Sequence, residues 1–326
     1  MFGGRGFRIT GINGETTQPF TTVTIIQNFE KSRFFEILVN YLKEWVLPPK
    51  IFRFFLRCAI NLYRLIPPPL KDRKILDRNS IFIDKYKGRR CFVIGNGPSL
   101  NKVDLSPLKN EITIVMNNFE HHPILEKWQP TIHCAGDGPY TFTHTHPEEL
   151  EKIKISYKKI KPEGFFVPLS MKSLIETNNM IPKDKVYYLD MNVDLSLFEE
   201  ITNRDIDLTK RMPSVYNTAL LAIILAMAIG CKKIYILGLD SDWSALATPL
   251  NIRTYHFYHE FNTDIEIDPN SLRGYYIGIF ERTTLPIFKC HKKLYEYARK
   301  NNIEIINVTD GSYLDEYPQA KFEDIL

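Results

Sequence analysis

The stretch CFVIGNGPSLNKVDLSPL (residues 91–108) starts with four apolar residues, breaks into GNGPS at 95–99, and becomes apolar again at Leu100. Because glycine has no side chain, Gly95 and Gly97 permit either a sharp reversal or a close approach of the backbone to a ligand. Ser99 can cap a helix that follows, and the free N–H groups at the start of a helix suit a phosphate. The turn lacks the third glycine of GxGxxG and the GKS or GKT of a Walker loop. It therefore indicates a nucleotide only in combination with the rest of the chain.

From Arg89 onward, short apolar runs alternate with helical patterns, the clearest of which is VYNTALLAIILAMAIG (215–230). Alternation of this kind is typical of a parallel sheet with helices on both faces. The sequence therefore predicts an α/β, Rossmann-like, mostly parallel domain over residues 75–326. The expected strands are CFVI (91–94), ITIVM (112–116), TIHCA (131–135), FFVP (165–168), VYYL (186–189), KIYILG (233–238) and IEIINV (303–308).

Small and polar residues gather where these strands end. Asn117 follows the second strand, Asp137 follows the third, and Gly238 and Asp240 follow the sixth. Ser214 comes just before the long helix and is expected to be its N-cap. Ligands of parallel sheets bind beyond the carboxyl ends of the strands. We therefore expect a nucleotide site at this edge, with residues 138–210 supplying a lid over the acceptor.

The first 74 residues differ from this domain. Residues 1–33 are polar, and residues 34–74 form an amphipathic arm of two short helical runs that ends in the proline-rich linker PPPLKDRK (67–74). In the second run Arg53, Arg57 and Arg64 share one helical face, and no acidic residue occurs among them. This pattern suits a helix on a membrane surface. The alternative is a helix that packs on the main domain with its arginines in water.

Composition excludes several classes of protein. A net charge of +4 argues against a nucleic-acid binder. The five cysteines are scattered without a CxxC pair, so they predict buried thiols in a reducing compartment and no zinc site. There is no long uncharged apolar segment and no secretory signal. We expect a cytoplasmic protein, peripheral on the inner membrane face.

Two blocks resemble a known superfamily. VIGNGPSLNKVDLSPLKN followed by VMNNF is similar to the nucleotide-binding motif of the bacterial CMP-sialic-acid sialyltransferases, and RMPSVYNTALLAIILAMAIGCKKIYILGLD is similar to their second block. The MptE-like group shares both blocks and includes 6-hydroxymethylpterin diphosphokinases and motility accessory factors. The resemblance covers residues 89–310, and its specific part is about fifty residues long. It implies a glycosyltransferase of surface polysaccharide or glycoconjugate assembly that uses a nucleotide-activated, CMP-linked sugar and a glycan or lipid-linked acceptor.

The resemblance also implies roles for individual residues. The turn residues Gly95, Asn96, Gly97 and Ser99 would lie against the phosphate and ribose. Asn117 would contact the donor near its phosphate and sugar, Ser214 would bind the donor, and Gly238 and Asp240 would border the base and ribose. Asp137 stands where the sialyltransferases tend to have asparagine, which puts the donor sugar in doubt.

The catalytic histidine of the bacterial enzymes lies in a HYIGH-like string, but the corresponding text here is YYIGI (275–279). The string HFYHE (256–260) instead resembles that of animal-type sialyltransferases. It makes His256 the candidate base and His259 the second candidate, since histidine titrates near working pH. Glu260 would orient one of them, and the hydroxyl of Tyr258 would face the leaving phosphate. The alternative is an aromatic loop that merely covers the sheet.

Two other functions stay open. An MptE-like diphosphokinase would transfer pyrophosphate from ATP and would need Mg²⁺, for which Asp137, Asp240 and Asp242 are candidates. A nucleotide-binding scaffold protein would have no catalytic base. The glycosyltransferase is expected to need no metal and no cofactor besides its donor.

Overall fold

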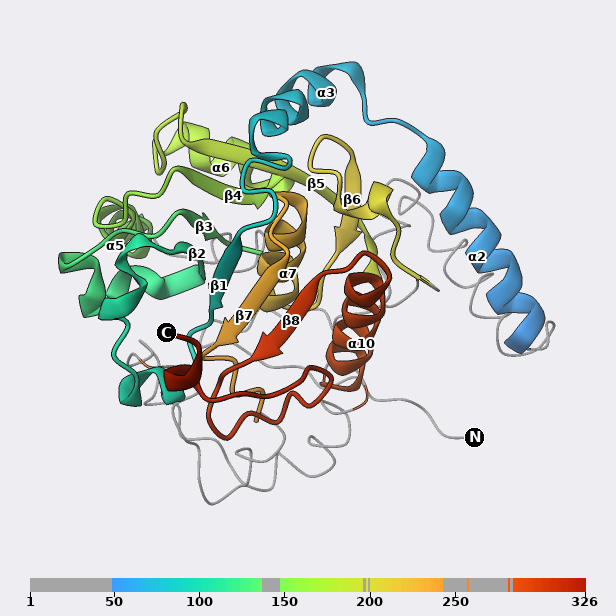
Figure 1. Cartoon of the computed structure of the whole chain (residues 1–326). Coiled ribbons are helices and arrows are strands. Elements are labelled where there is room, and N and C mark those ends of the chain that lie inside the picture. The colour runs from blue at the N-terminus through green and yellow to red at the C-terminus, as the bar shows by residue number, and fades with distance from the viewer. Residues whose placement is uncertain are drawn as a thin grey trace, which may run out of the picture.

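The computed structural model describes residues 49–136, 147–195, 198, 200–242, 257, 281 and 284–326. Its centre is an 8-stranded sheet in the order β6-β5-β4-β3-β2-β1-β7-β8, and the neighbouring strands pair in parallel (Figure 1). This confirms the α/β fold, and each of the seven predicted apolar runs is a strand. The strands are β1 (Arg90–Ile94), β2 (Ile112–Met116), β3 (Ile132–Cys134), β4 (Gly164–Pro168), β5 (Val186–Asp194), β6 (Arg211–Ser214), β7 (Lys233–Leu237) and β8 (Glu304–Asn307).

Strand β6 was not predicted, because RMPS is short and contains a proline. It pairs only with β5, at the end of the strand order, where a proline that cannot donate a backbone hydrogen bond is tolerated. Ser214 is therefore the last residue of a strand and not a helix cap. The cap of the following helix is Asn217, whose side chain accepts the backbone N–H of Leu220 at 3.0 Å.

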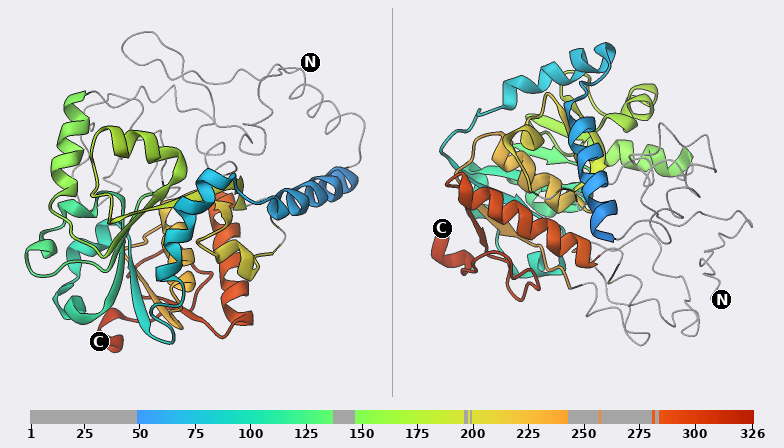
Figure 2. Two further views of the ribbon diagram at one scale, coloured as in Figure 1. Left: turned by 90° about the horizontal axis from the view of Figure 1, so that it is seen from above. Right: turned by 90° about the vertical axis from the view of Figure 1, so that its right-hand side faces the viewer.

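The two faces of the sheet have separate cores because successive side chains of a strand point to opposite sides. On one face Val93 and Ile114 pack against α7 (Thr218–Ala228), all of whose residues are buried, and against α10 (Leu285–Lys300). On the other face Phe92 and Val115 pack beneath 3-10 segments, α5 (Pro147–Tyr157) and α6 (Lys172–Thr177). Figure 2 shows these layers from two further directions. Helices on both faces are thus confirmed.

The described part of the arm contains α2 (Pro49–Leu65) and α3 (Leu70–Leu76). The second predicted helical run is thereby confirmed, whereas the first run and residues 1–33 lie outside the described residues. The predicted linker 67–74 is only half correct, since helix α3 begins at Leu70 directly after its N-cap Pro69. In the part of the chain that the structure describes, no helix is both long and apolar enough to cross a bilayer.

Residues 147–210 of the predicted lid include β4, β5 and α6, so that stretch contributes strands to the sheet itself. A role for residues 138–210 over an acceptor stays a prediction.

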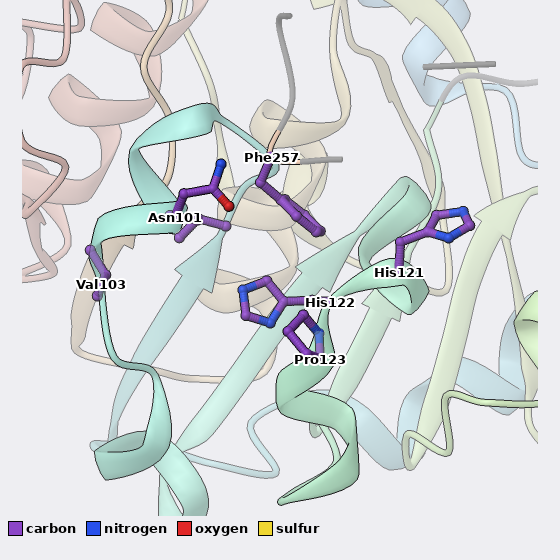
Figure 3. A pocket seen from close by; sticks show the side chains of 7 residues that line it. Asn101, Val103, His121, His122, Pro123 and Phe257 are labelled. Atoms are coloured by element: carbon purple, nitrogen blue, oxygen red, sulfur yellow. The ribbon is translucent and has the colours of Figure 1, made fainter. Parts of the chain in front are cut away.

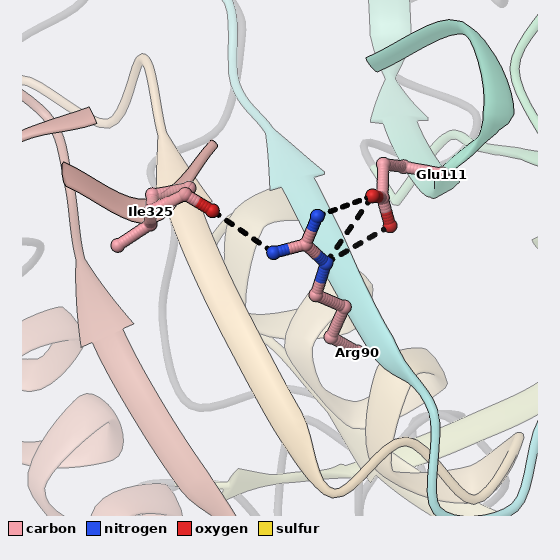
Figure 4. Close-up of polar contacts among 3 residues, drawn as sticks. All are labelled: Arg90, Glu111 and Ile325. Carbon is pink, nitrogen blue, oxygen red and sulfur yellow. Dashed lines mark hydrogen bonds and ion pairs between the residues drawn. The ribbon is translucent and has the colours of Figure 1, made fainter. Parts of the chain in front are cut away.

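At the amino edge of the sheet, Arg90 connects three parts of the chain (Figure 4). Its Nη2 atom lies 2.5 Å from Oε1 of Glu111, which directly precedes β2, and its Nη1 atom donates to the carbonyl of Ile325 at 2.9 Å. The end of the described chain is thereby held at the amino edge of the sheet. The loops of the candidate site lie at the opposite, carboxyl edge.

Candidate functional site

The chain changes direction across the sheet at the neighbouring strands β1 and β7. After β1 it proceeds through β2 to β6 on one side, and after β7 it proceeds to β8 on the other. Open α/β sheets bind ligands in the crevice outside the carboxyl ends of strands at such a point. The turns after both strands meet here, because the N–H of Gly95 donates to Leu237 at 2.8 Å and that of Gly97 donates to Gly238 at 2.9 Å.

Contact between these two turns explains their glycines. A Cβ atom on Gly97 would lie 1.7 Å from Oδ2 of Asp240, and one on Gly95 would lie 2.3 Å from the carbonyl oxygen of Gly238. Gly238 has a φ of +69°, and a Cβ atom there would lie 2.6 Å from Leu100. The glycines of both motif blocks are thus needed for the blocks to pack on each other. The sequence had suggested only a reversal or a ligand.

Ser99 has a different partner from the one expected. It lies in a 3-10 segment, Pro98–Lys102, whose N-cap is Gly97, so Ser99 does not cap a helix. Its N–H donates to Oδ1 of Asp240 at 3.1 Å and its hydroxyl donates to Oδ2 at 2.8 Å. Burial raises the pKa of the Asp240 carboxyl, and the two bonds from Ser99 oppose that effect. A carboxylate therefore occupies the N–H group that had been expected to bind a phosphate.

Asn117 is held by both its side chain and its backbone. It has a φ of +46°, in the left-handed region that asparagine tolerates better than most residues. Its Oδ1 atom accepts the hydroxyl of Thr218 at 3.0 Å, and Thr218 in turn accepts the N–H of Gly136 at 3.2 Å. The ends of β2 and β3 are thereby joined to the first residue of α7.

The backbone of Asn117 is fixed by His133, a fully buried residue of β3. The Nε2 atom of His133 lies 2.6 Å from the Asn117 carbonyl, so the ring must carry its proton on Nε2. Burial lowers the pKa of His133 to about 4, and the ring is therefore neutral near pH 7. We infer that His133 holds Asn117 in its left-handed conformation.

Asn96 connects the first turn to two other segments. Its side-chain nitrogen donates to the carbonyl of Met116 at 3.0 Å, and its own carbonyl accepts the N–H of Phe257 at 2.8 Å. Its Oδ1 atom is buried and has no hydrogen-bond partner among the described residues. Asn96 therefore offers a buried acceptor beside the turn.

A pocket of about 320 Å³ adjoins this turn (Figure 3). Figure 3 shows Phe257 and His122 next to each other in its lining, and their rings are in edge contact with centroids 4.9 Å apart. Burial lowers the pKa of His122 to about 4, so its ring is uncharged and acts as an aromatic surface. The pocket is lined by Leu100, Asn101, Val103, His121, His122, Pro123 and Phe257.

The structure brings most of the predicted donor residues into one region. The turn residues meet Gly238 and Asp240, and Asn117 lies where β2 ends, beside the start of α7. Ser214 is half-buried at the end of β6, and it is Thr218, four residues later, that contacts Asn117. Their contacts with a donor stay predictions. Asp137, His256, Tyr258, His259 and Glu260 lie outside the described residues.

Sequence reasoning missed Thr218 and His133. The Asn217-Thr218 pair just before an uninterrupted apolar run was an available signal, because asparagine is a preferred N-cap. His133 gave no usable signal, since its role depends on a contact with Asn117, which directly follows the neighbouring strand β2. Among the described residues, no group of three or more histidine, cysteine or acidic side chains is arranged to hold a metal ion.

No family model matches the sequence, and no curated protein matches it. Among solved structures, the chain is similar to the sialyltransferase CST-II, solved in complex with a trisaccharide acceptor and CMP. The identity is 14% and the TM-score 0.39, over 71% of this chain and 85% of that one. It is also similar to the MAf glycosyltransferase from Magnetospirillum magneticum AMB-1, with 12% identity and a TM-score of 0.40 over 77% of this chain and 38% of that one.

Proposed function

We propose that this chain is a glycosyltransferase that moves a sugar from a nucleotide-activated, CMP-linked donor to a hydroxyl of a glycan or lipid-linked glycan. One observation carries the proposal. The two sequence blocks that resemble the sialyltransferase motifs are separated by about a hundred residues, yet they are joined by the Ser99–Asp240 and Asn117–Thr218 hydrogen bonds. Three of the side chains that the resemblance assigns to the donor, those of Ser99, Asn117 and Asp240, therefore lie at the carboxyl edge of the sheet, where a ligand is expected.

The chemistry needs a base for the acceptor hydroxyl and donors for the departing phosphate. In the proposed reaction His256 takes the hydroxyl proton, the acceptor oxygen bonds to the anomeric carbon, and the bond from that carbon to the phosphate oxygen breaks. Asn117, which the resemblance assigns to the donor, and the N-terminus of α7 are the candidate partners of the leaving phosphate. The main-chain hydrogen bond between Phe257 and Asn96 supports the role of His256 as the base, because Phe257 directly follows His256 in the HFYHE string and lies beside the turn.

The test is nucleotide release by the purified chain from a panel of donors, with and without EDTA. The panel contains CMP-sialic acid, CMP-Kdo, UDP- and GDP-sugars, and ATP with hydroxymethylpterin. We expect CMP release that survives EDTA, is lost in His256→Ala, and persists in His144→Ala, the same change at a histidine with no proposed role. A companion titration should show that Asn117→Ala weakens the binding of CMP.

Other results would replace the proposal. AMP formed only with the pterin and Mg²⁺ would make the chain a diphosphokinase. CMP binding without release from any donor, even when glycan acceptors are supplied, would favour the scaffold protein. Equal CMP release by His256→Ala and the unaltered chain would retain the transferase but reject its base.

A further inference from the structure

Helix α2 is attached to the domain near its C-terminal end. Ile60 is 2% exposed within the core on the α7 face of the sheet, and the guanidinium of Arg211 lies 4.5 Å from the ring centroid of Tyr63. Arg211 also donates to the carbonyl of Ile66 at 3.4 Å and pairs with the largely buried Asp190 at 3.2 Å. The rest of α2 projects beyond the sheet, as Figure 1 and the left view of Figure 2 show. This attachment fixes which face of α2 is turned away from the domain.

That outer face is apolar. Six large apolar side chains in or directly after α2 are between 45% and 65% exposed. At 3.6 residues per turn their positions fall within an arc of about 120° on the side of the helix opposite Ile60. They form one stripe, which we call the α2 stripe: Ile51, Phe54, Phe55, Leu62, Leu65 and Ile66. Leu70 at the start of α3 extends it and is 75% exposed.

The charges of α2 favour one kind of partner for this stripe. The helix contains four basic residues (Lys50, Arg53, Arg57 and Arg64) and no acidic residue. At 3.6 residues per turn all four positions fall on the side of the helix opposite the stripe, which is the polar side of an amphipathic helix. A helix is about 10–12 Å across, so they still lie within about one Debye length of a surface that contacts the stripe. An anionic surface would be attracted. A second copy of this helix would bring eight positive charges together and would be repelled.

We propose that α2 is a membrane-surface helix, which inserts the α2 stripe between the headgroups of an anionic bilayer and holds the α/β domain against that surface. An interfacial helix combines an apolar face, basic residues and too little overall apolarity to span the membrane, and α2 has all three. Acidic lipids on the cytoplasmic leaflet provide the matching charge. The inference is independent of the proposed transferase activity, although it suits an acceptor linked to a lipid.

Co-sedimentation of the full chain with vesicles tests the proposal. The vesicles contain phosphatidylcholine alone or mixed with phosphatidylglycerol, at low and high NaCl. We expect binding to the mixed vesicles that weakens with salt, since salt screens the attraction between the helix and the lipid. Changing Phe54, Phe55 and Leu62 together to Gln should weaken binding on the order of tenfold or more, because these residues supply the inserted apolar area. A matched control changes Ile81 and Ile155 to Gln, at positions 60% and 51% exposed elsewhere on the surface.

Failure of the unaltered chain to bind mixed vesicles would overturn the proposal, as would equal binding by the triple variant. So would a dimer, measured by light scattering, that the triple variant converts to a monomer, because the stripe would then serve self-association. CMP release measured in solution without vesicles separates this outcome from a failure of the proposed function. Loss of vesicle binding with intact CMP release would reject only the membrane surface.

Discussion

Replacing Thr218 with valine removes one hydroxyl and keeps the shape of the side chain. The hydroxyl accepts the N–H of Gly136 at 3.2 Å and donates to Oδ1 of Asn117 at 3.0 Å. Thr218 is 2% exposed, so water cannot replace the missing atom without a rearrangement. The substitution should therefore uncouple the ends of β2 and β3 from the start of α7.

The expected cost follows from the two bonds. A donor that loses a buried acceptor, here the N–H of Gly136, costs about 1–3 kcal/mol, and the loss of an ordinary hydrogen bond, here that to the half-buried Asn117, costs about 0.5–1.5 kcal/mol. Valine fills nearly the same volume, so no cavity adds to these values. We expect Thr218→Val to lower the free energy of unfolding by about 2–4 kcal/mol.

Thr284 provides the matched control. It is also 2% exposed and stands at the start of α10, but its hydroxyl is buried with no hydrogen-bond partner among the described residues. Thr284→Val removes a hydroxyl that makes no bond to any described residue, so it should leave stability unchanged or raise it, within about 1 kcal/mol.

Urea denaturation followed by tryptophan fluorescence compares the two variants, and CMP titration reports on the site. Thr218→Val should shift the unfolding midpoint down and weaken CMP binding, whereas Thr284→Val should do neither. Equal midpoints for the two variants would refute the reasoning that the Asn117–Thr218–Gly136 bonds hold these elements together.

Three further predictions concern neighbouring parts of the fold. Gly97→Ala should cost about 1–3 kcal/mol of stability because its Cβ must displace Asp240; Gly136→Ala, with its nearest contact at 3.1 Å, should cost less in the same urea experiment. Burial raises the pKa of Glu120 from its ordinary 4.5 to about 7, so the folded state holds an extra proton between these values and stability should fall as pH rises from about 5 to about 8. Glu120→Gln should flatten that slope, and an unchanged slope would show that Glu120 is not its source. For His133 the pKa is lowered from 6.5 to about 4, so stability should fall as pH drops below about 6.5. The stability gap between the unaltered chain and His133→Phe should then narrow between pH 7 and pH 4, as acid unfolding curves can show.

The fold class could be predicted because its signals are local. Each apolar run of four to six residues was long enough to be recognised as a buried strand, and the eleven buried residues of α7 appear as one continuous apolar stretch. Strand β6 could not be predicted, because an edge strand with one neighbour needs little apolar sequence and tolerates Pro213. The predicted helix start was wrong by three residues, since the expected cap was Ser214 and the actual cap is Asn217. Ser214 is a good N-cap by type, but the chain needs three more residues after β6 to reach the start of α7.

For the candidate site too, some features could be predicted from the sequence and others could not. By itself the sequence determined which residue types stand at the strand ends, because a strand end is marked by its own apolar run and the small or polar residues that follow. Only the tertiary structure decided what those residues contact. Ser99 bonds Asp240 instead of capping a helix, and Asn117 depends on His133 and Thr218. Such contacts join segments separated by 16 to 141 positions. They arise from the order of the strands in the sheet, which no local pattern encodes.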